Sequence, residues 1–397
     1  MKFLHKFWKL FAIVWKTILG ALFCQGPIMA VVVIGWVYRL MQRSALKQWW
    51  QLTDSTDQYG PFNTGVLKHR TWNVHATYPN WFVEQRFWVT VPEGVKSGES
   101  YRKKTSFIAR SLLVGMGRNI KTGIQGIFNI WVLTIIPAML WNFGWYSGWI
   151  VSFDKVYENF SVGITLSLLG IFIFCATMIF LPMAQARQAV TGEWKSFYDF
   201  KLIRTLVRQN GFSCMLLALG YTFVSLPVTL FKFLPFTMDQ INPAVLTMTD
   251  AEFLSYMESY YFWTGMVGFL GYVFLHRWAA RVYARSVVAC IQNGTVELSE
   301  LAAFERNAIR TMKLDTVNEK TSQALLIRWA GLLTRRAWRV GLTVAVFVIW
   351  FSFVSQIYVS EFLNYHPVQG WMNQSLVQLP WFEYIPKHLS ESAALGN

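Results

Sequence analysis

The sequence has few charged residues and few cysteines, and both shortages limit what it can be. Only 14% of its 397 residues are Asp, Glu, Lys or Arg, whereas 54% are hydrophobic and 17% aromatic. Soluble domains carry about 25% charged residues. The four cysteines, Cys24, Cys175, Cys214 and Cys290, stand singly, without the paired spacing of a disulfide framework or a cysteine metal site. These features exclude a disulfide scaffold and indicate a membrane protein.

Recognisable catalytic motifs are missing as well. The sequence contains no HExxH, GxSxG, CxxC or P-loop pattern and no complete GxGxxG. None of its six histidines lies in the middle of a long apolar run, where haem-type cofactors of membrane helices find their ligand. We therefore predict no catalytic residues, no metal and no cofactor, and a protein that is not an enzyme.

Long apolar runs, by contrast, are plentiful. A bilayer core about 30 Å thick needs roughly 20 apolar residues in a helix. Four runs without Asp, Glu, Lys, Arg or His reach about this length, and a fifth reaches it if its helix begins near Tyr256. We expect an all-α polytopic membrane protein with five clear transmembrane helices. The runs are 126–149, 162–183, 212–231, 340–358 and 256–275.

The N-terminal region allows two interpretations. Residues 18–38 are apolar but are interrupted by Gly26 and Pro27, and proline bends a helix. Lysines recur near helical spacing over the first 17 residues, which is typical of an amphipathic helix on a membrane surface. The region is either a further span, with the N-terminus outside, or a re-entrant hairpin with both ends in the cytoplasm.

The segments between the apolar runs fall into a basic group and an acidic group. The basic group holds 29 Lys and Arg against 12 Asp and Glu, and the acidic group holds 3 against 9. Cytoplasmic loops carry the excess of Lys and Arg, so we place the basic group in the cytoplasm and the C-terminus outside. The basic segments are 39–121, 184–210 and 276–339, and the acidic segments are 150–161, 232–261 and 359–397.

Basic residues beside the predicted spans are expected to face anionic lipid headgroups on the cytoplasmic side, at about 1 kcal/mol each. The bilayer is then the main partner, and a membrane protein is a second. Nucleic acid, which the net charge of +15 would indicate in a soluble chain, is not expected. These residues are Arg39, Arg43, Lys201, Arg204, Arg208, Arg277, Arg281, Arg285, Arg335, Arg336 and Arg339.

The largest polar segment carries a strand pattern. Residues 71–78 and 87–91 are rich in β-branched and aromatic residues, with the breaker Pro79-Asn80 between them. We predict a small β-hairpin in a cytoplasmic insertion, followed by helical spacing over 106–121. The whole chain then divides into an N-terminal helix and span or hairpin (1–43), the insertion (44–122), three transmembrane helices with an interfacial helix at 196–209 (123–235), an outer loop and transmembrane helix (236–292), a cytoplasmic helical segment (293–338), the last transmembrane helix (339–360) and an extracytoplasmic surface tail (361–397).

Polar residues inside the predicted spans are neutral, which argues against a proton pump or a charge-coupled carrier. Such residues usually bond neighbouring helices, at about 0.6–2 kcal/mol each. The alternative is a pathway for a neutral solute between helices kinked at Pro137 and Pro227. The candidate pathway residues are Asn129, Thr134, Thr222, Ser225 and Ser355.

One pair of segments is similar within the chain, and another pair resembles motifs of other proteins. Phe180-Leu181 with Ala186-Arg187 is echoed by Phe274-Leu275 with Ala280-Arg281, either as a repeat of paired helices or by coincidence. The stretches Gly35–Arg43 and Pro182–Gly192 resemble motifs of uncharacterised bacterial polytopic membrane proteins that contain a domain of unknown function. This resemblance implies a bacterial inner-membrane location and no particular activity.

These patterns favour a non-enzymatic inner-membrane protein that acts as a scaffold or accessory subunit of a membrane assembly. The alternative is a permease or channel for a neutral or lipidic solute. A lipid-acting enzyme using Glu258 or Asp250 is a third hypothesis, but it lacks a partnered base or metal site.

Overall fold

The computed structural model describes the greater part of the chain, and its regular elements there are all helices. The described residues are 14–24, 27–53, 62, 101–145, 160–234, 238–315 and 325–363. The long helices are α2 (Pro27–Gln51), α7 (Tyr101–Trp145), α9 (Phe160–Thr191), α11 (Gly211–Phe233), α13 (Asp250–Gln292) and α15 (Leu325–Leu363). The short helices are η2 (Trp194–Tyr198), α10 (Phe200–Gln209), α12 (Met238–Ile241), η4 (Pro243–Thr247), η5 (Leu298–Glu300) and α14 (Ala303–Thr311).

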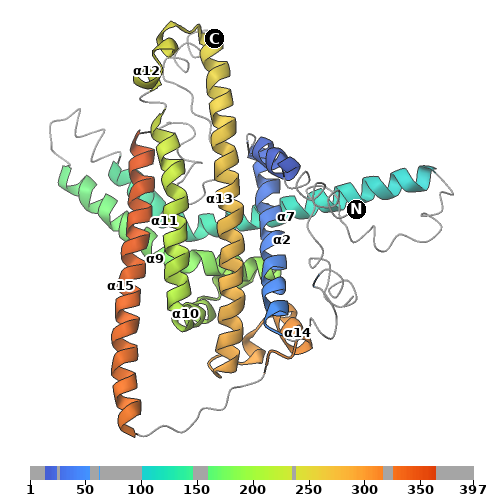
Figure 1. The fold of residues 1–397 in the computed structure, drawn as a ribbon, viewed down its shortest axis with the longest axis vertical. Helices are drawn as coiled ribbons and strands as arrows, with labels where there is room; N and C mark the ends of the chain where they lie inside the picture. The colour runs from blue at the N-terminus through green and yellow to red at the C-terminus, as the bar shows by residue number, and fades with distance from the viewer. Residues whose placement is uncertain are drawn as a thin grey trace, which may run out of the picture.

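The long helices form two sets (Figure 1). Helices α15, α11, α13 and α2 stand side by side in that order, with contacts between each neighbouring pair. Helices α7 and α9 pair with each other and run across this row. The C-terminal ends of α2 and α13, the N-terminal end of α15 and the short helices α10 and α14 lie toward the same end of the row.

The core is centred on α2. From Val32 to Leu46 almost every side chain of this helix is buried, including Tyr38 and Met41. A helix that is buried on all sides must be surrounded by other elements. Helices α7, α9 and α13 provide these contacts. Helix α2, at one end of the row, therefore packs against both α13 of the row and the pair α7 and α9, which we call the crossing pair.

Helices α2 and α7 approach each other at two glycines. A Cβ atom on Gly35 would lie 1.8 Å from the backbone oxygen of Asn119, and one on Gly123 would lie 2.1 Å from that of Val31. Such close backbone approach is the usual role of small residues between membrane helices. Beside the first glycine, the Arg39 Nη1 donates to Asn119 Oδ1 at 2.9 Å.

The prediction of five clear transmembrane helices is wrong in number. Among the described residues, three segments are long and apolar enough to cross a membrane: Leu112–Leu140, Gly163–Thr191 and Arg336–Ser355. The bent pair Phe200–Gln209 and Gly211–Pro227, whose two helices meet at 97°, makes a fourth if it counts as one span. The run expected at 256–275, which lies in α13, is not among these segments.

The N-terminal region consists of two separate helices in the described residues. A short apolar helix covers Val14–Phe23, and α2 then begins at Pro27. Proline is well tolerated in the first turn of a helix, where its missing N–H has no intrahelical acceptor. In the described residues, Pro27 is the first residue of α2.

The described residues do not support the predicted β-hairpin insertion, and that prediction is wrong. The described part of the chain contains no strand, and the two expected strands, 71–78 and 87–91, lie outside it. The described regular structure within segment 44–122 is helical. Helix α2 extends into it as far as Gln51, and α7 begins at Tyr101. Local β-propensity was the only basis for the strands, and it is a context-dependent signal.

Candidate functional site

Buried charged residues gather where α9, α13 and α14 meet. Arg187 of α9 and Glu305 of α14 form an ion pair, with 3% and 0% of their side-chain surfaces exposed. Tyr283 of α13 is fully buried beside them, and Asp199 lies between η2 and α10 at the partly exposed edge. We call these four residues the Arg187 network.

Arg187, Tyr283 and Glu305 are each held by more than one side-chain contact, and Asp199 by one. The Arg187 Nη1 donates to Glu305 Oε2 at 3.1 Å and to Tyr283 Oη at 3.2 Å, and its Nη2 donates to Asp199 Oδ2 at 2.7 Å. The Tyr283 hydroxyl donates to Glu305 Oε1. The Ala302 backbone N–H donates to Glu305 Oε2 at 3.2 Å, which ties the start of α14 to the network.

Burial determines the proton affinities of the two interior acids. Loss of hydration raises the pKa of the Glu305 carboxyl, while Arg187 and the donated hydrogen bonds offset part of the rise. Burial and the adjacent Glu305 raise the pKa of Tyr283, so its hydroxyl keeps its proton and remains a donor. The buried positive charge of Arg187 is therefore neutralised by the carboxylates of Glu305 and Asp199.

Replacing Glu305 by Gln is expected to remove a pH dependence of stability. Because the folded-state pKa of Glu305 lies above its ordinary value of 4.5, the unfolded chain releases this proton first as pH rises. The wild-type protein should therefore lose stability relative to Glu305→Gln from about pH 4.5 upward, until pH exceeds the folded-state pKa. Thermal melting of both proteins in one detergent from pH 4 to 8 measures the difference, and a constant difference would contradict the assignment.

The network joins elements, and of its four members only Asp199 is partly exposed to solvent. Arg187 and Glu305 point toward one another across a helix junction, and their polar contacts are intramolecular. The described residues contain no group of His, Cys, Asp and Glu arranged to hold a metal ion. What the arrangement can do is fix α14 and the η2–α10 junction against α9 and α13.

The predicted lipid-facing residues lie in different environments. Arg39 is buried with 4% exposure and bonds Asn119, and the Arg43 guanidinium lies 5.1 Å from the Phe62 ring centroid. Arg277 is half-buried, and the side chain of Arg335 lies outside the described set. The remaining residues are exposed at one end of the row of helices: Lys201, Arg204, Arg208, Arg281, Arg285, Arg336 and Arg339.

The candidate pathway residues are spread over three helices. Asn129 donates to the Trp194 carbonyl at 2.9 Å and accepts from the Tyr198 hydroxyl at 3.0 Å. Thr134 and Ser225 donate to carbonyls one turn away in their own helices, and Thr222 also reaches the Ile349 carbonyl of α15 at 3.4 Å. Asn129 and Thr134 are in α7, Thr222 and Ser225 in α11, and Ser355 in α15.

Little in the sequence pointed to the Arg187 network. Arg187 belongs to a possible repeat with Arg281 and to the stretch Pro182–Gly192, but neither pattern predicts a site, and none was predicted at Tyr283, Glu305 or Asp199. One available signal was the position of Arg187 just beyond an uncharged run, in a stretch with a family-like pattern. The two stretches with that pattern do pack together, since Gln42 Nε2 donates to the Val190 carbonyl at 2.7 Å.

The fold and the network define a helical protein with segments long and apolar enough to cross a membrane, which fits a membrane protein. No family model, curated protein or solved structure matches the sequence.

Proposed function

We propose that the protein is a scaffold or accessory subunit of an assembly in the bacterial inner membrane, with its C-terminus outside the cell membrane. The observation that carries the proposal is the Arg187 network. Its buried charged groups bind one another and so hold together α9, α13, α14 and the η2–α10 junction. Charged groups that move a solute must instead face the solute.

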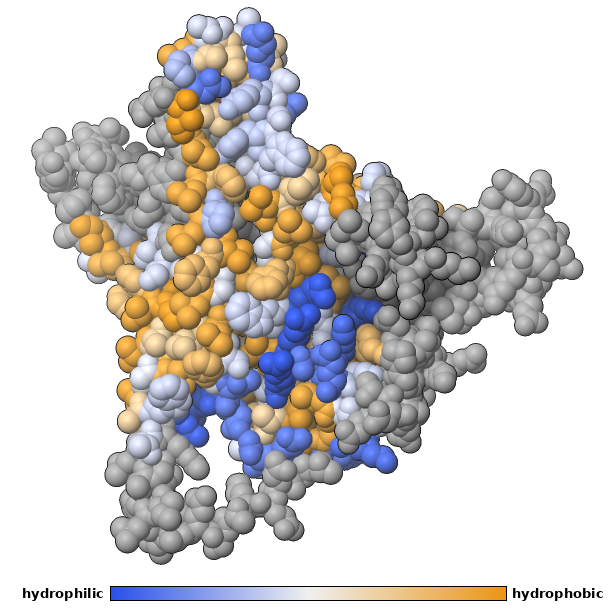
Figure 2. Space-filling model, in the orientation of Figure 1, coloured by the Kyte–Doolittle hydropathy of each residue, from blue (hydrophilic) through white to orange (hydrophobic). Residues whose placement is uncertain are grey.

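The distribution of surface residues supports the membrane orientation. Figure 2 shows hydrophobic residues over the middle of the visible face, hydrophilic residues gathered in its lower half, and further hydrophilic residues at its upper tip. This half contains the C-terminal part of α13 with Arg281 and Arg285, and the short helix α14 (Figure 1). An excess of exposed arginine at one end of a helix bundle is typical of its cytoplasmic end.

Large apolar side chains on the crossing pair support a role in lipid or protein contact. Phe128, Ile136 and Phe143 of α7 are 55%, 65% and 61% exposed, and Phe172 of α9 is 50% exposed. Exposed apolar surface of this kind is covered by lipid or by another protein in a membrane assembly. A partner membrane protein therefore has surface available for contact.

Deletion of the gene is expected to lower the abundance of the partner proteins, because unassembled membrane subunits are degraded. Quantitative proteomics of isolated membranes measures this loss. Complementation with wild type or with Arg281→Ala should restore the partners, whereas Arg187→Met should not. An unchanged membrane proteome together with reduced uptake of a neutral solute would overturn the proposal in favour of a permease.

A further inference from the structure

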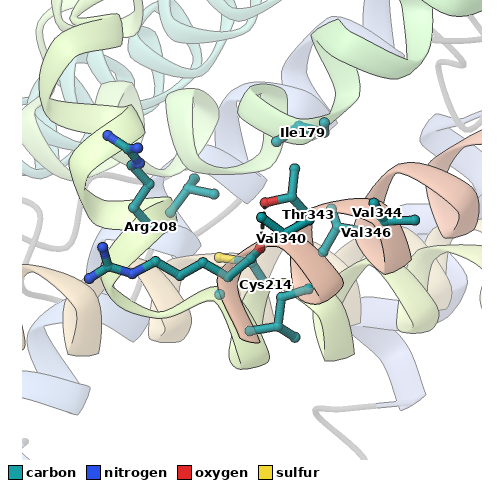
Figure 3. Close-up of a pocket in the computed structure, with 11 residues that line it drawn as sticks. Ile179, Arg208, Cys214, Val340, Thr343, Val344 and Val346 are labelled. Atoms are coloured by element: carbon teal, nitrogen blue, oxygen red, sulfur yellow. Dashed lines mark hydrogen bonds between the residues drawn. The ribbon is translucent and has the colours of Figure 1, made fainter. Parts of the chain in front are cut away.

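A groove lies between the α10–α11 elbow and α15 (Figure 3). Its volume is about 320 Å³, at the small end of the roughly 300–1,000 Å³ range of ligand pockets. Its walls are mostly apolar and include Ile179 of α9 and Val340, Val344 and Val346 of α15. The sequence-based prediction treated this region only as lipid-facing surface.

Two arginines provide the charge of this groove. Arg208 comes from the last turn of α10 and Arg339 from α15, both are exposed, and both line the groove. Among the described residues neither guanidinium forms an ion pair. The Thr343 hydroxyl donates to the Arg339 carbonyl at 2.8 Å, so the two guanidinium groups are the groove's available donors. Two like charges on one small groove favour an anion between them.

Apolar and charged residues are separated along the groove. In Figure 3 the guanidinium of Arg208 lies toward one end, and Val344 and Val346 lie toward the other. Seven residues of helix separate Arg339 from Val346, which corresponds to about 10 Å. A ligand that fits this arrangement has an anionic head and an apolar chain.

The elbow sets the depth of the groove in the membrane. Helix α10 buries Leu202, Ile203 and Leu206 and exposes Lys201 and Arg204, and it meets α11 at 97°. If α11 crosses the bilayer, α10 lies near the membrane plane, as interfacial amphipathic helices do. Arg208 is then at headgroup level, and the apolar end of the groove points into the hydrocarbon.

We propose that this groove binds one anionic phospholipid, with its phosphate between Arg208 and Arg339 and one acyl chain against Val344 and Val346. The inference rests on the membrane location proposed above and adds a specific ligand to it. A guanidinium pair recognises phosphate by paired, charge-assisted hydrogen bonds. A zwitterionic lipid has the same phosphate but carries a compensating ammonium, so it should bind more weakly.

Native mass spectrometry of the purified full-length protein tests the site. The protein is delipidated in detergent and titrated with phosphatidylglycerol or phosphatidylcholine of identical chains. One phosphatidylglycerol per chain should be retained, with preference of about tenfold or more over phosphatidylcholine, since two basic contacts near a surface correspond to at least that ratio. The Arg208→Gln/Arg339→Gln variant should lose this preference.

Two further variants distinguish lipid binding in the groove from general electrostatic attraction between anionic lipid and exposed basic residues. Arg204→Gln/Arg336→Gln removes the same charge from exposed positions of the same helices outside the groove, and should change binding by less than about threefold. Val344→Trp fills the groove at a position that is 57% exposed, and should weaken retention of both lipids without changing charge.

Several results would overturn the proposal. These are equal loss in the two arginine pairs, equal retention of both lipids by the wild type, retention of phosphatidylglycerol by both groove variants, or displacement of the lipid by millimolar inorganic phosphate. The measurement uses the isolated chain, so its failure is distinguishable from failure of the scaffold role, which is read from partner abundance in cells.

Discussion

Replacing Arg187 by Met is expected to destabilise the folded protein by about 3–5 kcal/mol, because it leaves the fully buried Glu305 carboxylate without its positive partner. The loss should be smaller at low pH, where burial already favours the protonated carboxyl. Unfolding in mixed micelles, followed by tryptophan fluorescence, measures the change. Helix α14 should be the first element to lose protection from hydrogen exchange, since Glu305 and the Ala302 N–H tie it to the bundle.

The matched control is Arg281→Met. Arg281 follows the same Phe-Leu and Ala pattern in the sequence, but its side chain is exposed. Exposed substitutions of this kind usually change stability by less than about 0.5 kcal/mol. Equal effects of the two substitutions would show that the network does not hold the fold. A double variant, Arg187→Met with Glu305→Met, should regain part of the lost stability, as replacement of a whole buried ion pair by apolar residues often does.

Gly35→Ala is expected to separate α2 from α7. The added methyl group would lie 1.8 Å from the Asn119 backbone oxygen, and a backbone atom cannot move aside as a flexible side chain can. Overpacking typically costs about 1–3 kcal/mol, and the bond between Arg39 and Asn119 should be lost in addition. Gly123→Ala should have a similar effect, because its methyl group would lie 2.1 Å from the Val31 oxygen.

Gly117→Ala in the same helix is the control for this prediction. No atom lies within 4 Å of a Cβ built there, and the residue is exposed. The substitution should stabilise α7 by up to about 1 kcal/mol, since alanine is the better helix former. The two substitutions should therefore shift the melting temperature in opposite directions. A downward shift at both positions would mean that the α2–α7 contact is not the cause.

Helix positions were the most predictable part of the fold. Long uncharged runs require a helix in a membrane, and four of the five expected runs lie within α9, α11, α13 and α15. The described part of the remaining run, 126–145, lies in α7. The uncharged runs did not predict the full lengths of two helices. Helix α7 begins at Tyr101, far before its apolar part, and α13 extends beyond its apolar part at both ends. Charged residues can continue a helix, so hydropathy alone does not mark where a helix ends.

The candidate site was much less predictable than the helices. Whether an arginine is buried depends on which elements meet around it, and this is decided by contacts distant in sequence. Glu305 reaches Arg187 across 118 positions of the chain. Arg39 shows the same difficulty, since it was expected at the lipid surface and instead bonds Asn119 inside the bundle. The exposed arginines of α10 and α15 were predictable because helical spacing sets their faces.

The shortage of charged residues inside the apolar runs favours the scaffold hypothesis. In the structure, the buried charged residues of the Arg187 network hold helices together. Native mass spectrometry of the protein, released from its own membranes in polymer-bounded lipid discs, tests the scaffold role most directly. A scaffold or accessory subunit should carry one or more other membrane polypeptides bound in a fixed ratio to this chain. Recovery of the chain alone, without a second polypeptide at any mild extraction condition, would contradict the scaffold role.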